Sequence, residues 1–210
     1  DVQYRESIFI GYRYYDKTEK NVRFPFGFGL SYTSFEYSDI KLRKKNLTKG
    51  EGAKVTFTVK NTGDTAGAEI AQVYVAKPAS KIFRAPKELK GFAKVYLEPG
   101  EEKKVTVELD DRAFAFWNTA TNDWSVESGE YKILVGASSR DIRLEAEVKM
   151  KSEDDSSIVD LRDTAGVYFD GDPARATEAD FRAVYGGEFK FAPEITNDSL
   201  NNSIERSRGK

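Results

Sequence analysis

The centre of the chain alternates apolar and polar residues in short runs that turn residues interrupt. Over residues 54–60, every second position is apolar, occupied by Val55, Phe57 and Val59. This period of two is typical of a strand with one buried face. The segment Asn61-Thr62-Gly63-Asp64 then ends the run with residues that favour turns. Further runs that predict strands cover residues 70–75, 89–97, 105–109, 113–117, 131–135 and 142–148.

An earlier run over residues 35–42 changes its parity near Ser38-Asp39. A β-bulge, which inserts one extra residue into a strand, explains such a change. A series of short strands without an intervening helix predicts an all-β fold, an antiparallel sandwich or barrel. Residues 35–149 match the length of an immunoglobulin-like sandwich, about 100 residues. Because the chain has no cysteine, the disulfide-bridged kind is excluded and the fibronectin type III-like kind remains.

The two flanks of this region have a different texture. Residues 1–34, which we call the leader, are rich in aromatic residues and glycine, whereas residues 150–210 are polar. Within this C-terminal extension, Thr177 is placed to cap one short helix that ends at Gly186-Gly187. We therefore divide the chain into the leader, a sandwich domain over residues 35–149, and the extension.

Composition excludes several kinds of chemistry. The chain has neither cysteine nor histidine, so it offers no thiolate zinc site and no Ser-His-Asp or Cys-His triad. Its 33 basic and 35 acidic residues leave a net charge of −2, which does not attract nucleic acid or an anionic membrane. No run approaches the about 20 apolar residues that span a bilayer. We expect no cofactor, no metal, and no nucleic-acid or membrane partner.

The acidic pairs predict local structure and not catalysis. Asp110-Asp111 follows a strand, where adjacent side chains point to opposite faces, so we expect turn and cap residues. Asp154-Asp155 lies in a polar stretch, residues 151–157, that we expect to be a solvated linker. Asp170-Gly171-Asp172 resembles the start of a calcium loop that later positions do not complete. We predict no catalytic and no metal-binding residue in this chain.

The leader holds the strongest candidates for contact with another surface. A strand-like run leads into an aromatic and charged cluster, and residues 24–33 then alternate rings with glycines. Two interpretations stay open, because the rings either pack on the sandwich or belonged to the core and rim of a neighbouring domain. Rings beside Arg and Asp also suit sugar faces and hydroxyls. The weak candidates for substrate binding are Arg13, Asp16, Phe26 and Phe28.

An ordered series of motifs over residues 3–149 resembles the C-terminal part of glycoside hydrolase family 3, the β-glucosidase and β-xylosidase family. The motifs are Tyr4-x-Glu6-x-Ile8-x-x-Gly11-Tyr12-Arg13-x-Tyr15-Asp16, Phe24-Pro25-Phe26-Gly27-x-Gly29-Leu30-Ser31-Tyr32-Thr33, Val59-Lys60-Asn61-Thr62-Gly63, Gly67-Ala68-Glu69-x-x-Gln72-x-Tyr74-Val75, Pro86-Lys87-Glu88-Leu89-Lys90-Gly91-Phe92, Leu97-x-Pro99-Gly100-Glu101 and Gly129-x-Tyr131-x-x-x-Val135-Gly136-Ala137-Ser138-Ser139.

The resemblance implies a parent enzyme with a TIM-like barrel, an α/β sandwich domain and a fibronectin type III-like domain. Residues 1–34 are then the end of the α/β sandwich domain with its connecting loop, residues 35–149 the fibronectin type III-like domain, and residues 150–210 a polar linker and C-terminal extension. Catalysis in the family is retaining, with an Asp nucleophile and a Glu acid/base. The nucleophile's motif is missing here, and Glu6 is not identified with the acid/base, so no catalytic residue is transferred.

The sequence therefore favours a scaffolding piece, cut from a longer retaining β-glycosidase, with β-glucosidase the preferred activity. Its expected partners are the missing barrel and α/β sandwich domains, a carbohydrate substrate through the parent, and further copies of itself through the exposed leader. The alternative is a stand-alone carbohydrate-binding or adhesion module, for which Phe92, Tyr96 and Trp124 are the outward-facing rings. A cytoplasmic location is slightly favoured over a secreted one.

Overall fold

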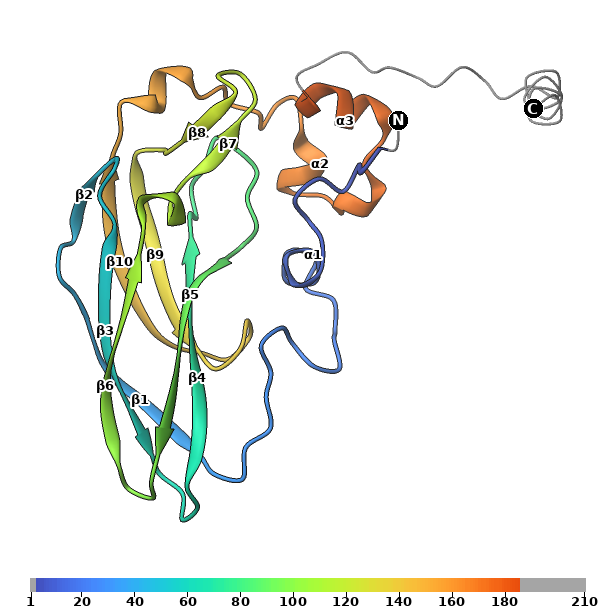
Figure 1. The fold of residues 1–210 in the computed structure, drawn as a ribbon. Coiled ribbons are helices and arrows are strands. Elements are labelled where there is room, and N and C mark those ends of the chain that lie inside the picture. Colours follow the sequence, from blue (N-terminus) through green and yellow to red (C-terminus); the bar gives the residue numbers. More distant parts are fainter. Residues whose placement is uncertain (1–2, 186–210) are drawn as a thin grey trace, which may run out of the picture.

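Two β-sheets packed face to face form the middle of the chain in the computed structural model, which describes residues 3–185 (Figure 1). Three strands, in the order β1–β3–β6, form one sheet: β1 (Phe35–Leu42), β3 (Ala53–Asn61) and β6 (Glu102–Leu109). The other sheet has the order β2–β10–β9–β4–β5: β2 (Asn46–Thr48), β10 (Ile142–Lys151), β9 (Gly129–Gly136), β4 (Gly67–Ala76) and β5 (Glu88–Leu97). All neighbours are antiparallel except β2 and β10. The predicted sandwich is confirmed.

The core lies between the sheets and follows the period of two. In β3, Val55, Phe57 and Val59 are fully buried, while the residues between them face outward. The register pairs Val55 with Val107 and Phe57 with Val105, so the apolar faces of β3 and β6 coincide. Tyr131, Ile133 and Val135 of β9 close the core from the other sheet. Alternation in sequence thus becomes one apolar layer because neighbouring strand residues point to opposite faces.

The change of parity in β1 is a bulge, as predicted. The β1–β3 register shifts between Ser38 and Lys41, and Asp39 has a left-handed φ of 56°. The shift lets apolar residues on both sides of it pack against the core.

The strand predicted over residues 113–117 is only partly right. A 3₁₀ turn, η1 (Asp111–Ala113), precedes the short β7 (Phe116–Asn118), which pairs with β8 (Asp123–Ser125). The side chain of Asp110 accepts a hydrogen bond from the Ala113 amide at 3.0 Å and caps the turn. The expected capping role of Asp110 is therefore confirmed. The capped turn occupies the first part of the segment that was predicted to be a strand.

The prediction that Asp154 and Asp155 are solvated linker residues is wrong. They begin the 3₁₀ turn η2 (Asp154–Ser157), and their carboxylates accept the amides of Val126 and Ser128, each at 2.9 Å. Asp154 also pairs with Lys49 at 2.8 Å. The acidic pair ties the chain to the end of the sandwich, because loop amides there have no strand partner.

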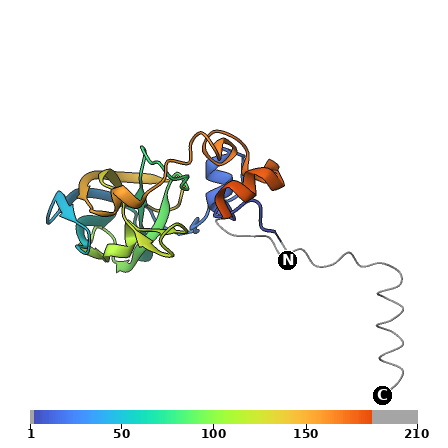
Figure 2. The ribbon, with the colours of Figure 1, turned by 90° about the horizontal axis from the view of Figure 1, so that it is seen from above.

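The leader and the C-terminal extension form a second, helical group beside the sandwich (Figure 2). It contains α1 (Tyr12–Lys17), α2 (Gly166–Phe169), η3 (Pro173–Arg175) and α3 (Glu178–Tyr185). Phe9, Phe83 and Tyr168 are buried together, with the Phe83 and Tyr168 rings stacked at 4.7 Å. The strand-like start expected for the leader is wrong, since it folds into turns and α1.

The helix predicted after Thr177 is confirmed as α3. Thr177 and Asp180 exchange hydrogen bonds, with the Asp180 amide donating to the Thr177 hydroxyl at 3.2 Å and the Thr177 amide donating to the Asp180 carboxylate at 2.8 Å. This reciprocal arrangement caps the first turn. The predicted stop at Gly186-Gly187 lies outside the described residues. Across residues 3–185, no helix is long and apolar enough to cross a membrane.

Candidate functional site

The helix α1 of the leader is fastened to the sandwich by buried charge. Only 4% of the Asp16 side chain is exposed, and its carboxylate lies 3.1 Å from Lys87 Nζ and 3.0 Å from Arg140 Nε. Arg140, in the turn between β9 and β10, also donates to the backbone carbonyls of Tyr15 and Lys20, at 3.0 and 2.8 Å. A buried carboxylate is tolerated when cations and donors surround it. Asp16 therefore joins three segments that are distant in sequence.

A second set of contacts repeats this link one turn earlier in α1. Arg13 Nη2 lies 3.1 Å from the carboxylate of Glu88, at the start of β5. The Tyr12 hydroxyl accepts the Leu89 amide at 2.9 Å, and the Tyr12 ring stacks on Phe26 with centroids 4.5 Å apart. The helix is thus fixed to β5 by an ion pair and a hydrogen bond, while the ring contact joins it to the segment over residues 24–33.

The segment over residues 24–33 is held through its backbone. The Gln72 side chain donates to the carbonyls of Gly27 and Ala137, at 3.0 and 2.8 Å, and the Ser139 amide donates to the Phe26 carbonyl at 2.9 Å. Gly27 has a φ of 79°, and a Cβ there would lie 2.0 Å from Gln72 Oε1. Glycine is required at this point by both conformation and space.

The apolar side chains of the same segment point away from the sandwich. We call them the leader face; its members are Phe24, Phe26, Phe28, Leu30 and Tyr32. Leu30 and Tyr32 are 92% and 98% exposed, and nearly half of Phe28 is exposed. Several exposed apolar side chains on one short segment favour an interaction site. The leader therefore combines a fixed backbone with uncovered rings.

The structure brings together three of the four residues named from the sequence. Arg13 and Phe26 lie against the Tyr12 ring, and Asp16 belongs to the same helix, α1. Phe28 lies apart, and its ring tilts against Phe24 with centroids 5.2 Å apart. Lys87, Arg140 and Gln72 hold the leader and were not among the residues predicted for the site. One signal was available for Gln72, since it is a polar residue within the apolar run over residues 70–75.

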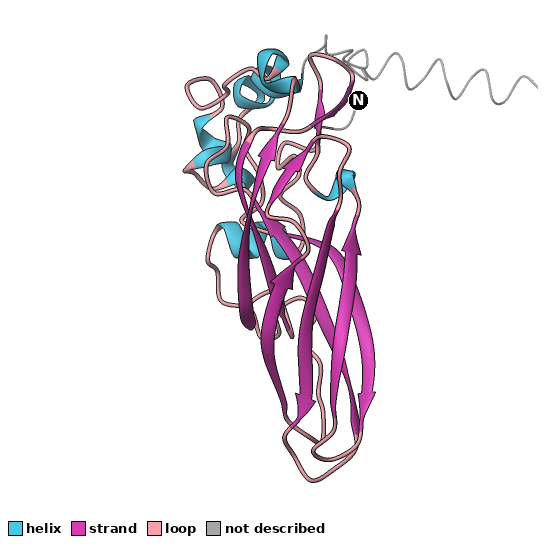
Figure 3. Ribbon diagram, turned by 90° about the vertical axis from the view of Figure 1, so that its left-hand side faces the viewer, coloured by secondary structure: helices cyan, strands magenta, loops and turns pink. Residues whose placement is uncertain are grey.

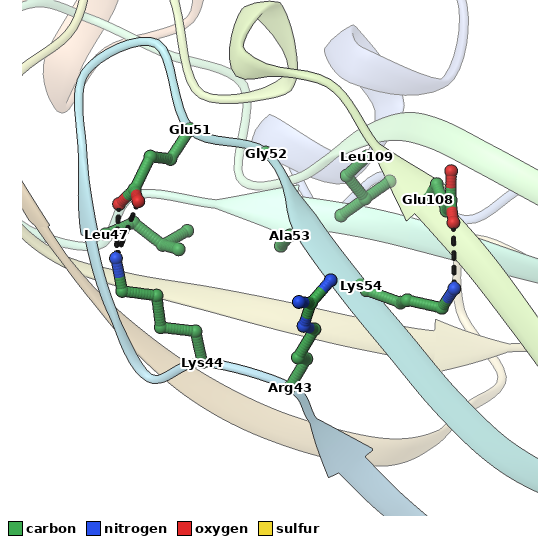
Figure 4. A pocket seen from close by; sticks show the side chains of 9 residues that line it. All are labelled: Arg43, Lys44, Leu47, Glu51, Gly52, Ala53, Lys54, Glu108 and Leu109. Carbon is green, nitrogen blue, oxygen red and sulfur yellow. Dashed lines mark hydrogen bonds and ion pairs between the residues drawn. The ribbon is translucent and has the colours of Figure 1, made fainter.

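A hollow of about 570 Å³ opens at one end of the sandwich and contains two carboxylates (Figure 4). Glu51 binds Lys44 at 2.6 Å, and Glu108 binds Lys54 at 2.9 Å on the opposite side of the hollow. The Lys44 ammonium and the Thr48 amide and hydroxyl lower the pKa of Glu51 to about 2, and Lys54 lowers the pKa of Glu108. The two carboxylates are therefore held in exposed ion pairs on opposite sides of the hollow.

Other polar clusters in the described part of the chain are structural. Residues 3–185 contain no group of acidic residues arranged to hold a metal ion. Asp172, from the sequence that resembles a calcium loop, instead caps η3 by accepting the Ala174 amide at 3.1 Å. Ser138 accepts the amides of Arg140 and Asp141 in a buried turn, at 3.3 and 3.0 Å.

Comparison with known proteins gives this arrangement a context. Residues 69–139 match the model of the fibronectin type III-like domain. The crystal structure of Bifidobacterium adolescentis GH3 beta-glucosidase superposes on this chain with a TM-score of 0.65. The match covers 69% of this chain and 21% of that chain, and the sequence identity is 50%. The chain belongs to glycoside hydrolase family 3. It matches the non-catalytic C-terminal region of these enzymes.

Other relatives of this family 3 chain extend the match. Thermostable beta-glucosidase B of Acetivibrio thermocellus is 55% identical over 72% of this chain and 20% of the relative. An exo-alpha-(1->6)-L-arabinopyranosidase of Bifidobacterium breve is 44% identical over 92% of this chain and 25% of the relative. The beta-D-glucoside glucohydrolase of Trichoderma reesei is 36% identical, with a TM-score of 0.67. The chain thus spans 17% to 25% of the length of the curated relatives it matches.

Proposed function

We propose that this chain braces the catalytic domains of a retaining β-glycosidase, and that the parent removes terminal β-glucosyl residues from oligosaccharides or glucosides. The observation that carries the proposal is the leader, whose backbone is fixed to the sandwich while its rings are exposed. Such a segment is shaped to be covered by another surface.

The domain division supports the same proposal. Residues 1–34 are assigned to the end of the α/β sandwich domain, residues 35–149 to the fibronectin type III-like domain, and residues 150–210 to an extension. The buried group of Phe9, Phe83 and Tyr168 joins the first and last of these to the loop before β5. The extension therefore stabilises the junction between the sandwich and the missing domains.

The four candidate residues divide into two roles in this proposal. Arg13 and Asp16 are anchors, because their charges are already paired with Glu88, Lys87 and Arg140. Phe26 and Phe28 are the contact residues, because part of each ring stays uncovered. A neighbouring domain or the substrate it holds lies against these rings.

The test uses the full parent enzyme with Phe28→Ala, and with Val159→Ala as a control. Val159 is an exposed apolar residue outside the leader face. We expect Phe28→Ala to lower kcat/KM on aryl β-glucosides about tenfold, because loss of the ring loosens the docked domains, and we expect the control to leave it unchanged. Unchanged kinetics together with unchanged thermal stability in Phe28→Ala would overturn the docking role.

A further inference from the structure

The two tryptophans of the chain form an exposed pair away from the leader face. Trp117 and Trp124, the only tryptophans in the sequence, lie directly opposite each other in the β7–β8 hairpin, which we call the Trp hairpin. Directly opposite residues of an antiparallel pair share one face. Their ring centroids are 5.6 Å apart at 80°, and the side chains are 47% and 38% exposed. Figure 3 shows this hairpin at the end of the molecule where the helices gather.

The hairpin does not depend on the indoles for its attachment to the sandwich. Its inward positions are the buried Asn118 and Ser125. Asn118 donates to the Ser157 carbonyl and to the Ser125 hydroxyl, each at 3.3 Å, and its side-chain oxygen accepts the Ala120 amide at 3.0 Å. Because polar contacts anchor the hairpin, two large exposed rings on its other face need another explanation.

A cation beside the pair adds hydrogen-bond donors. The guanidinium of Arg112, in η1, lies 4.1 Å from the ring centroid of Trp124. Within residues 3–185 this guanidinium has no ion pair and no side-chain hydrogen bond that would occupy its N–H groups. Stacking on a ring leaves the edge of a guanidinium free to donate in its own plane. Rings and directed donors are therefore adjacent on one surface.

The surrounding charges select the kind of ligand. Asp111 and Asp123 are exposed beside the pair, and each uses one carboxylate oxygen to accept a backbone amide, at 3.0 and 2.7 Å. These carboxylates disfavour a phosphate or another anion, whereas they accept hydrogen bonds from hydroxyls. A neutral pyranose fits, because its C–H face stacks on an aromatic ring while its equatorial hydroxyls meet donors and acceptors at the rim.

We propose that Trp117, Trp124 and Arg112 form a binding platform for neutral β-linked gluco-oligosaccharides. The choice of glucosyl units rests on the proposed function, but the platform itself rests on the Trp hairpin. A small exposed surface with two rings set edge to face gives weak binding, with a Kd of about 1 mM. The platform would hold a longer substrate near the enzyme without cleaving it.

The experiment titrates the 210-residue chain with cellopentaose and follows intrinsic tryptophan fluorescence, which reports only on Trp117 and Trp124. We expect saturable quenching with a Kd near about 1 mM, weakened at least about tenfold in Trp117→Ala and about threefold in Arg112→Ala. Ile70→Ala, which removes an exposed apolar side chain on β4, serves as the control and should bind as the wild type does. Circular dichroism confirms that each variant is folded.

Other outcomes are equally decisive. Absence of a saturable change with any neutral oligosaccharide overturns the platform, and leaves the proposed function to its own kinetic test. Binding of xylo-oligosaccharides in place of gluco-oligosaccharides upholds the platform and overturns its glucosyl assignment. If sulfated oligosaccharides bind more tightly than neutral ones, the conclusion that Asp111 and Asp123 select a neutral ligand is overturned. Equal binding by wild type and Trp117→Ala overturns the assignment of the site to the Trp hairpin.

Discussion

Single side chains decide how firmly the leader is held on the sandwich. Asp16 is the clearest case. Its buried carboxylate contacts Lys87 and Arg140, which lie far from it in the sequence and come from two different loops. Gln72 does the same for residues 24–33 through hydrogen bonds to two carbonyls. Both side chains hold the leader in place, because their polar atoms contact other groups of the chain.

Asp16→Asn should release α1 from the sandwich while leaving the sheets intact. Removing the charge leaves Lys87 and Arg140 without their shared partner, at a cost of about 3 kcal/mol to local stability. Hydrogen exchange should become faster for the amides of residues 12–17 and stay unchanged in β3. The control is Asp163→Asn, at an exposed position. Equal exchange in α1 of the variant and the wild type would contradict the anchoring role.

At the scale of elements, the alternation of apolar and polar residues predicted strands correctly where burial of one face alone determines the structure. The period of two predicted β3, β6 and β10 and their core faces, because burial of one face requires it. The strand predicted over residues 113–117 was wrong in its first part, where the turn capped by Asp110 lies. The solvated linker predicted from the polar residues 151–157 was wrong at Asp154-Asp155, because their amide partners come from the loop before β9.

The leader shows why the candidate site was only partly predictable. Its rings and glycines were visible in the sequence, and so was the resemblance that explains them. The contacts of Asp16 with Lys87 and Arg140 were not, because the pairing of charges between loops depends on how the strands place those loops. The burial of Phe9 against Tyr168 was hidden for the same reason, since its partner lies in the distant extension.

The turn between β2 and β3 should respond to acid through Glu51. Its folded-state pKa of about 2 lies below the usual 4.5, so the turn is stabilised above pH 4.5 and loses that stabilisation as the pH falls toward about 2. The melting temperature should fall less over this pH range in Glu51→Gln than in the wild type. Glu102→Gln, at an exposed strand position, is the control and should behave as the wild type does. An identical acid response in the wild type and Glu51→Gln would contradict this account.

At the scale of the whole molecule, the chain combines a well-packed sandwich with an uncovered apolar surface. The core between the sheets is closed by fully buried residues from both of them. The leader face is the opposite, since it is apolar and faces outward. The chain is therefore suited to be one part of a larger assembly, in agreement with its match to 17% to 25% of the length of its curated relatives.

The isolated chain should self-associate through the leader face. Burying these side chains between copies removes apolar area from water, at about 25 cal/mol per Å². Sedimentation velocity should show a mass that rises with concentration, and Leu30→Ser with Tyr32→Ser should shift it toward the monomer. Both residues are almost fully exposed, so these changes spare the fold. A monodisperse wild-type monomer with a protease-resistant leader would contradict the prediction.

The central claim is that this chain supports catalysis elsewhere and performs none itself, and it is tested most directly by assaying the purified 210-residue chain on aryl β-glucosides. The account predicts no release of the aryl group above the rate without protein, because the carboxylates of the hollow are already paired with lysines. Saturable turnover by the purified chain, lost on substitution of one of its own carboxylates, would contradict it.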